Sequence, residues 1–147
     1  MSYEIKVVRR VEFSETDMAG IVHYANFFRY MEVAEHEFFR SLGFSVVTRQ
    51  TEPPVGWPRV HAECDYKHPL KFEDLFEIHM LVSLKKNRSL GYEFRFRKIN
   101  ESPPIEVARG SLRVVCVTHQ HGKMKAAAIP AAIADKIEVA PARELEP

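Results

Sequence analysis

Long hydrophobic runs are lacking in this sequence of 147 residues. No stretch approaches the roughly eighteen consecutive apolar residues that a membrane-spanning helix needs. The first residues, MSYEIKVVRRVEF, also lack the continuous apolar core of a secretory signal peptide. We therefore expect a cytoplasmic protein without a membrane span.

The sequence also lacks an excess of positive or negative charge. The chain has 21 basic and 20 acidic residues, which are interspersed and leave a formal net charge of +1. Such a balance creates no general electrostatic field for a nucleic acid or an anionic membrane surface. We expect neither as a partner.

Cysteine is scarce, and the possible metal ligands are not grouped. Cys64 and Cys116 stand far apart in stretches that alternate polar and apolar residues, so we interpret them as buried free thiols rather than as a disulfide framework. His61, His119 and His121 have no second ligand pair at a spacing typical of metal sites. We predict no metal site.

The residues that are present suffice for one compact domain. With 46% hydrophobic residues, a chain of 147 residues can build one core but is too short for two ordinary domains. A chain of this size buries roughly 70% of its unfolded surface when it folds, so it needs no disulfide or metal for stability. We expect a single domain over residues 1–138 and a mobile, proline-containing tail over residues 139–147.

One long helix and five strands explain the hydrophobic periodicity. Apolar residues recur at steps of three and four from about Tyr24 to Leu42, and Gly43 is a typical left-handed cap residue. Alternation of polar and apolar residues predicts strands over residues 3–13, 59–66, 76–84, 90–97 and about 106–118. The run IPAAIADKI predicts one further helical turn near the end.

These elements predict an α+β protein with the hot-dog fold. Several connections between the strands are shorter than the roughly twelve residues that a parallel crossover needs, so the strands must mostly pair antiparallel. Five strands and one helix can bury their apolar faces only if the sheet curls around the helix. The curled sheet keeps two free edges, which two copies can satisfy by pairing. We therefore predict a homo-oligomer, either a dimer or a dimer of dimers.

An acid and a glycine, Asp17 and Gly20, stand just ahead of the long helix. Asp17 is either a helix cap or a carboxylate placed for chemistry, and its position several residues before the helix favours the second reading. Gly20 is the better candidate for the turn, because a glycine lets the amides of residues 21–24 stay accessible at the helix start. A carboxylate facing a carbonyl that such amides hold is suited to acyl transfer to water.

The run ETDMAGIVHYANF, with a strand before it and a helix after it, resembles the acyl-CoA thioesterases of the 4-hydroxybenzoyl-CoA thioesterase type. The resemblance continues in the same order through KKNRS, RVVCV and AIPAAI, and it covers nearly all of the chain except the tail. It implies a hot-dog fold with active sites at a dimer interface, and hydrolysis of an acyl-CoA thioester to a carboxylic acid and CoA. Coenzyme A is then part of the substrate, and no cofactor is implied.

The resemblance also implies roles for single residues. It places the catalytic carboxylate at Asp17, as nucleophile or general base, and the amides that polarise the thioester carbonyl between Val22 and Tyr24, with Tyr24 as the leading candidate. His23 is either catalytic or a hydrogen-bonded structural group. Further substrate-binding positions are Gly20, Val22 and Asn26 near the helix start and Lys86, Arg88 and Ser89 in the basic turn, where cations would hold the phosphates of CoA.

Three alternatives stay open at this point. A second branch of hot-dog thioesterases carries its catalytic acid inside the long helix, where this chain has Glu32, Glu35 and Glu37, but we expect these acids to be solvated. An acyl-thioester hydratase or dehydratase could use Asp17 and His23 to move protons. A non-catalytic module that binds acyl-CoA or acyl carrier protein could share the same fold.

The acyl group is not determined by the sequence. Phe27, Phe28, Trp57 and Tyr92 are compatible with an aromatic, a short branched or a medium aliphatic group. Trp57 itself either lines the acyl pocket or packs under the loop that precedes the next strand.

Overall fold

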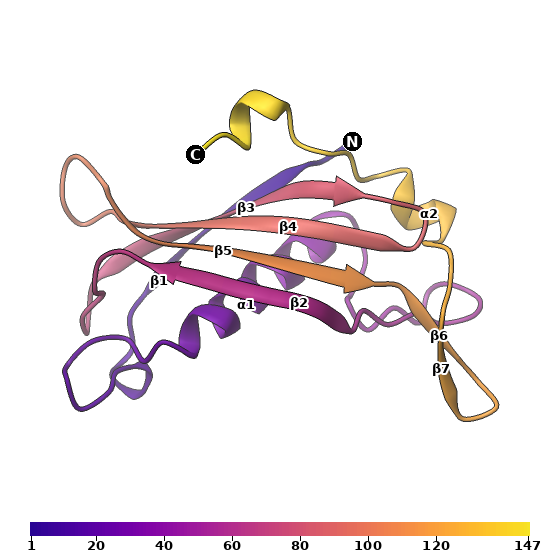
Figure 1. Cartoon of the computed structure of the whole chain (residues 1–147), viewed down its shortest axis with the longest axis horizontal. Coiled ribbons are helices and arrows are strands. Elements are labelled where there is room, and N and C mark those ends of the chain that lie inside the picture. Colours follow the sequence, from indigo (N-terminus) through magenta and orange to yellow (C-terminus); the bar gives the residue numbers. More distant parts are fainter.

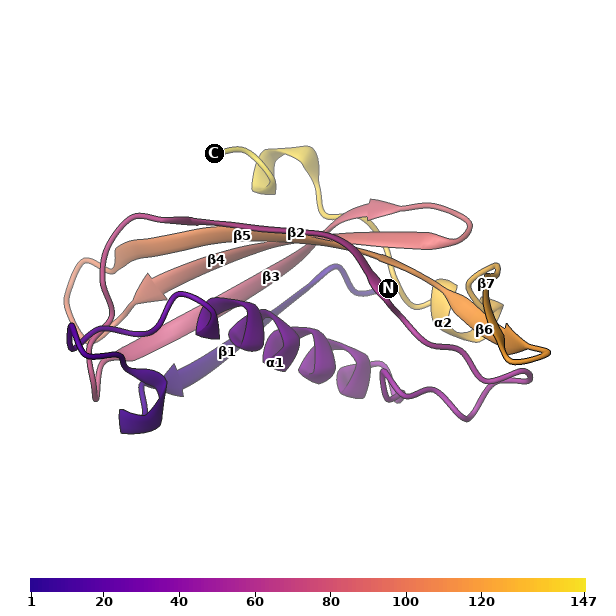
Figure 2. The ribbon, with the colours of Figure 1, turned by 60° about the horizontal axis from the view of Figure 1, so that its bottom comes forward.

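The computed structural model describes residues 1–147 and shows a curled antiparallel sheet wrapped around one long helix (Figure 1; Figure 2). The sheet has the strand order β1-β3-β4-β5-β2. Its strands are β1 (Glu4–Arg10), β2 (Arg59–Tyr66), β3 (Leu75–Lys85), β4 (Ser89–Lys98) and β5 (Ile105–Val115), and the helix is α1 (Asn26–Ser41). The smaller elements are the 3-10 turns η1 (Phe13–Glu15) and η2 (Ala142–Glu144), the hairpin of β6 (Val117–Gln120) and β7 (Lys123–Ala126), and the helical turn α2 (Ala131–Ala134). This is the predicted hot-dog arrangement.

Helix α1 lies in the hollow of the sheet because one side of it is apolar. Its buried apolar residues recur at steps of three and four and are Phe27, Tyr30, Met31, Ala34, Phe38 and Phe39. Gly110 on β5 allows the close approach, because a Cβ at that position would overlap Cε of Met31. The helix is followed by Gly43 with a φ of +89°, which is the left-handed cap predicted from the sequence.

Three boundaries differ from the sequence prediction. β1 ends at Arg10 because the chain turns into η1, and α1 begins at Asn26 rather than near Tyr24. The last predicted strand breaks at Cys116, whose amide donates a hydrogen bond to the carbonyl of Arg88 at 2.7 Å. Beyond this break the chain leaves the large sheet, and β6 pairs with β7 instead.

The strands β1 and β2 form the two free edges of the sheet. Every residue of β2 except Cys64 is exposed, including the apolar residues Val60 and Tyr66. An exposed edge strand presents unpaired N–H and C=O groups that can pair with another chain. Both edges are open to the predicted pairing of two copies, and β2 is the more exposed of the two. The oligomeric state itself stays a prediction.

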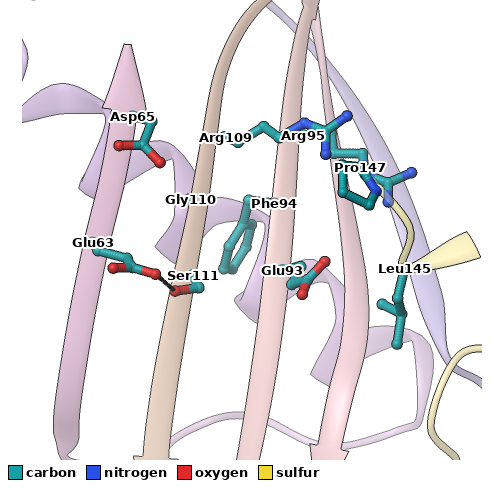
Figure 3. A pocket seen from close by; sticks show the side chains of 10 residues that line it. All are labelled: Glu63, Asp65, Glu93, Phe94, Arg95, Arg109, Gly110, Ser111, Leu145 and Pro147. Carbon is teal, nitrogen blue, oxygen red and sulfur yellow. Dashed lines mark hydrogen bonds between the residues drawn. The ribbon is translucent and has the colours of Figure 1, made fainter. Parts of the chain in front are cut away.

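The C-terminal segment 139–147 lies on the outer face of the sheet, on the side opposite α1 (Figure 2). The amide of Ala140 donates to a carbonyl of β3 at 2.8 Å, and the guanidinium of Arg95 donates to the carbonyl of Glu144 at 2.5 Å. Figure 3 shows the end of this segment, Pro147, close to Arg95. The structure therefore shows these residues bound to the sheet, and the mobility expected for them stays a prediction.

Three further observations concern groups that the sequence analysis considered. Cys64 and Cys116 are both free, as predicted, but only Cys116 is buried, whereas Cys64 is half-buried. No three or more His, Cys, Asp or Glu side chains are grouped so that they could hold a metal ion. None of the helices is both long and apolar enough to cross a membrane.

Candidate active site

Asp17 lies in a tight turn ahead of the long helix. Its amide donates to the carbonyl of Ile21 at 2.8 Å, and its carbonyl accepts from the amide of Gly20 at 2.9 Å. Gly20 has a φ of +81°, so the turn role predicted for this glycine is confirmed. Oδ1 of Asp17 accepts the amide of Ala19 at 2.8 Å, which orients the carboxylate and leaves Oδ2 without a partner in the chain. The capping interpretation of Asp17 is wrong, because the N-cap residue of α1 is Ala25.

The side chain of Asn26 fastens this turn to the start of α1. Its Nδ2 donates to the carbonyl of Glu15 at 2.7 Å, and the amide of His23 donates to the same oxygen at 2.9 Å. Glu15 precedes Asp17 by two residues, so these two bonds fix the position of Asp17 relative to the helix. Asn26, which was expected to bind the substrate, thus uses its side-chain nitrogen to hold the loop.

Fewer amides are free at the helix start than the sequence suggested. The amide of Val22 donates to the carbonyl of Leu70 at 2.8 Å, and the amide of His23 is used as described above. The amide of Tyr24 has no hydrogen-bond acceptor in the chain, and it lies near the positive end of the helix dipole. The ring of His23 accepts the amide of Ala25 at its Nδ1 at 3.2 Å, which supports the structural role of this histidine.

Asp17 and Tyr24 lie on the wall of a cavity of about 460 Å³. The other lining residues are Ile21, Val22, Phe27, Tyr66, Lys67, His68, Pro69 and Leu70. Six of the ten lining residues are hydrophobic, so the cavity is suited to an acyl group with a few polar atoms at one end. The hydroxyl of Tyr66 donates to the carbonyl of Tyr24 at 3.1 Å, and burial raises the pKa of Tyr66 to about 12.

This chain is similar to known proteins. Residues 11–137 match the family model of the thioesterase-like superfamily. The chain belongs to this superfamily. The membership confirms the family resemblance inferred from the sequence, together with the expected class of enzyme, a thioester hydrolase.

The relatives of this thioesterase-like chain include proteins of several organisms. A protein described as a putative esterase from Aquifex aeolicus is 39% identical over 106 residues, which cover 71% of this chain and 78% of the relative. Acyl-CoA thioesterase YbgC of Haemophilus influenzae is 28% identical over 121 residues, which cover 82% of this chain and 85% of the relative. A solved gentisyl-coenzyme A thioesterase has a TM-score of 0.74 at 31% identity, with 88% of this chain and 98% of that chain covered.

The basic turn of this thioesterase-like chain, between β3 and β4, lies at the opposite end of the sheet from the segment that precedes α1 and contains Asp17 (Figure 1). This turn joins β3 to β4 and contains Lys86 and Arg88, the cations predicted to hold the phosphates, while Ser89, the third predicted substrate-binding residue, is the first residue of β4. The start of β3 lies near the Asp17 turn, and its eleven residues span about 33 Å at about 3.3 Å per residue. Within one chain the fold therefore does not bring the basic turn to the cavity.

One buried charge was missed by the sequence analysis. Glu35 was expected to be solvated, but its side chain is 0% exposed and accepts hydrogen bonds from Nη1 and Nη2 of Arg59 at 3.0 and 2.6 Å. Its neighbour Glu32 is half exposed, as expected. The signal that could have revealed the pair is an arginine at the first position of the strand that follows the helix, because a buried carboxylate needs a cation.

Trp57 is buried beside this ion pair. Its ring packs against Phe39 with the ring centroids 5.4 Å apart, which supports the packing interpretation. Trp57 also lines a second cavity, of about 380 Å³, together with Glu35 and Arg59. This second cavity lies beside the C-terminal half of α1, whereas the cavity of Asp17 lies beside the N-terminal end of the helix.

Proposed function

We propose that this protein hydrolyses acyl-CoA thioesters to a carboxylic acid and free CoA. One observation carries the proposal: the oriented carboxylate of Asp17 and the unpaired amide of Tyr24 lie on the wall of the same largely apolar cavity. An acyl group in this cavity would place its thioester carbonyl between the carboxylate and the amide. The names of the relatives agree with this reaction class, because two of them are described as acyl-CoA and gentisyl-CoA thioesterases.

Asp17 would act on the carbonyl carbon in one of two ways. As a nucleophile, its Oδ2 would attack the carbon and expel the CoA thiolate, and water would then cleave the mixed anhydride. As a general base, it would accept a proton from water while the water oxygen attacks the same carbon. Both routes consume one water and end in the carboxylic acid and CoA.

The amide of Tyr24 would stabilise the oxyanion that forms on the carbonyl oxygen. One donor of this kind typically contributes about a hundred- to a thousandfold in rate. The adjacent end of helix α1 would add a favourable dipole at the same place. The amides of Val22 and His23 are left out of this role because both already donate within the chain.

We further infer that two copies pair through β2, because this pairing would supply the missing cations. Two β2 strands that pair around a two-fold axis run antiparallel, so the second sheet is turned end for end. The end of the sheet that carries Lys86 and Arg88 in one copy then lies at the end that carries Asp17 in the other. Lys86 and Arg88 of the partner subunit would be available for the phosphates of CoA.

The hydratase or dehydratase alternative has less support. It needs an acid and a histidine that both face the substrate, but Nδ1 of His23 already accepts the amide of Ala25, which leaves only Nε2 of this ring for proton transfer. The binding-module alternative would use the same cavity without turnover.

Thiol release tests the proposal against both alternatives. Purified protein is incubated with benzoyl-, 4-hydroxybenzoyl-, short-chain and long-chain acyl-CoA, and free CoA is followed with a thiol reagent. We expect release of CoA from at least one member. A change in absorbance without thiol would indicate hydration or dehydration, and calorimetric binding without either signal would indicate a binding module.

A further inference from the structure

The hydroxyl of Tyr66 ties the start of α1 to the edge strand β2. It donates to the carbonyl of Tyr24 at 3.1 Å, and 42 positions separate the two residues in the sequence. Tyr66 is the last residue of β2, while Tyr24 lies two residues before the first residue of α1. The bond therefore joins the sheet to the residue whose amide is the proposed donor to the oxyanion.

The ring of Tyr66 is packed so that its hydroxyl reaches this carbonyl. Its centroid lies 5.3 Å from that of Phe27 at an interplanar angle of 77°, and 6.5 Å from that of Tyr24 at 86°. Both are edge-to-face contacts, which aromatic rings prefer. The direction of the hydroxyl is thus set by packing as well as by the hydrogen bond. A phenylalanine at this position could keep both ring contacts and would lack only the hydroxyl.

A second side chain holds the same peptide group. The carbonyl of Tyr24 and the amide of Ala25 belong to one peptide group, and Nδ1 of His23 accepts that amide at 3.2 Å. At the other end, the carbonyl accepts the hydroxyl of Tyr66 and, over a longer distance of 3.3 Å, the amide of Phe27. Both ends of the peptide group after Tyr24 are therefore held by hydrogen bonds.

The peptide group before Tyr24 is the one that carries the free N–H. Its carbonyl, on His23, accepts the amide of Asn26 at 2.9 Å, while its N–H, on Tyr24, has no acceptor in the chain. Each peptide group is planar, and the two groups share the Cα of Tyr24, so each can turn only about the bonds of this atom. The free N–H therefore keeps its direction only while both groups are held.

We propose that Tyr66 is a positioning residue for hydrolysis: its hydroxyl, together with Nδ1 of His23, fixes the peptide group after Tyr24 and so aims the Tyr24 amide at the thioester carbonyl oxygen. The inference rests on the proposed function, because it concerns the amide that stabilises the oxyanion in that reaction. It also gives His23 a defined task, which is to accept a hydrogen bond rather than to move a proton.

A donor to an oxyanion works best when it is aimed before the reaction, because no reorientation is then needed as the charge develops. Tyr66 is 47% exposed in the single chain, and it lines the cavity of Asp17. An acyl group in this cavity would cover the ring and exclude water from the bond between Tyr66 and Tyr24. Exclusion of water strengthens such a bond, so the amide would be held most firmly in the complex with the substrate.

Tyr66→Phe tests the role of the hydroxyl, because it keeps the ring. We expect kcat to fall about two- to tenfold, the range that the net strength of one hydrogen bond allows, and KM to change less than about twofold. The matched control is Tyr3→Phe, which removes a hydroxyl that donates to Glu144 in the C-terminal segment at 3.2 Å. This control should keep the wild-type kcat. A Tyr66→Phe protein with the kcat of the wild type would overturn the proposal.

Two substitutions of His23 separate an acceptor from a proton carrier. His23→Leu removes the acceptor of the Ala25 amide, whereas His23→Asn offers a side-chain oxygen that can accept the amide two residues further on. We expect kcat to fall about two- to tenfold in His23→Leu and clearly less in His23→Asn. An equal loss in both variants would show that the imidazole itself is needed, and it would contradict the positioning role.

The carbonyl of a bound substrate reports the direction of the amide itself. The acyl-CoA with the highest kcat/KM is labelled with ¹³C at the thioester carbonyl and bound to Asp17→Asn, and its resonance is compared with that of the free ester. A hydrogen bond to the carbonyl oxygen moves this resonance to a higher chemical shift. We expect that change in Asp17→Asn and in Asp17→Asn/Tyr3→Phe, and a smaller one in Asp17→Asn/Tyr66→Phe. Equal changes in all three proteins would overturn the proposal.

The failure of the inference can be told apart from the failure of the proposed function. Thiol release that Tyr66→Phe leaves unaffected would contradict the inference alone. If no acyl-CoA released thiol, the proposed hydrolysis would be wrong, and the ¹³C comparison would be made between the wild type and Tyr66→Phe with the acyl-CoA that binds most tightly in calorimetry. Equal resonances in these two proteins would then overturn the role of Tyr66.

Discussion

Replacing Arg59 by methionine should destabilise the protein by an amount that depends on pH. The substitution leaves the carboxylate of Glu35, which is 0% exposed, without its cation. Taking up a proton lowers the free energy of an unpaired buried carboxylate, because the neutral acid is less costly to bury than the charged group. With an unfolded-state pKa of about 4.3, protonation costs about 1.36 × (7 − 4.3), or about 3.7 kcal/mol, at pH 7 and about 2.3 kcal/mol at pH 6.

The sign of the pH dependence follows from the proton binding of the two states. Burial raises the pKa of Glu35 even in the presence of Arg59, so removal of the cation raises this pKa further. The folded variant then binds a proton more tightly than the unfolded chain does, and its stability falls as the pH rises above about 4.3. The loss relative to the wild type should grow by about 1.4 kcal/mol per pH unit between pH 6 and pH 7.

Urea unfolding at a fixed protein concentration measures this loss. The concentration must be constant because a dimer couples folding to association. The double variant Glu35→Gln/Arg59→Met is the control, since it has no buried charge and should recover most of the stability without the extra pH dependence. A loss in Arg59→Met that does not change between pH 6 and pH 7 would refute the reasoning.

Three further predictions concern other parts of the molecule. Asn26→Ala removes one of the two donors to the carbonyl of Glu15, so kcat should fall about tenfold or more while KM changes little in steady-state kinetics, because a displaced carboxylate acts mainly on the chemical step. Glu106 lies 2.7 Å from Lys67 and 2.6 Å from Arg109, and the side-chain hydrogen bond from Arg109 is the largest of the contacts that lower its pKa to about 2. Glu106→Gln should therefore cost about 1 kcal/mol at pH 7, after allowance for its partial exposure, and this cost should disappear as the pH falls from about 4.3 toward 2 in thermal melts. Gly110→Ala should destabilise by about 1 to 3 kcal/mol in urea unfolding, because the added methyl group overlaps the end of the Met31 side chain and lies 3.1 Å from the carbonyl oxygen of Glu63; an unchanged midpoint would show that the Met31 side chain can repack.

The elements of the fold were predictable because their signals are local. The periodicity of α1 and the alternation of β3 and β4 come from residues that are neighbours along the chain, and Gly43 marks the helix end by its own conformational freedom. The break at Cys116 was not predictable in this way. It depends on a hydrogen bond to Arg88, which is distant in sequence, so the alternation of polar and apolar residues does not indicate it.

In the candidate site, too, the features set by neighbouring residues were predictable and those set by residues distant in sequence were not. The turn of Asp17 and Gly20 involves residues within one short segment, so the sequence indicated this part correctly, whereas Asn26 was expected to bind the substrate and its side chain instead holds the carbonyl of Glu15. The choice among the amides was not visible, because the carbonyl that occupies Val22 belongs to Leu70. Likewise, the burial of Glu35 follows from packing against a later strand, which helical periodicity does not include.

The central claim is that the carboxylate of Asp17 drives thioester hydrolysis. The most direct test is thiol release by Asp17→Asn on the best substrate of the wild type, with Glu93→Gln as the control for a carboxylate on the outer face of the sheet (Figure 3). The account predicts that kcat falls about a thousandfold in Asp17→Asn, that CoA binding measured by calorimetry changes less than about twofold, and that Glu93→Gln behaves as the wild type does. An Asp17→Asn protein that keeps more than about a tenth of the wild-type kcat would contradict the account.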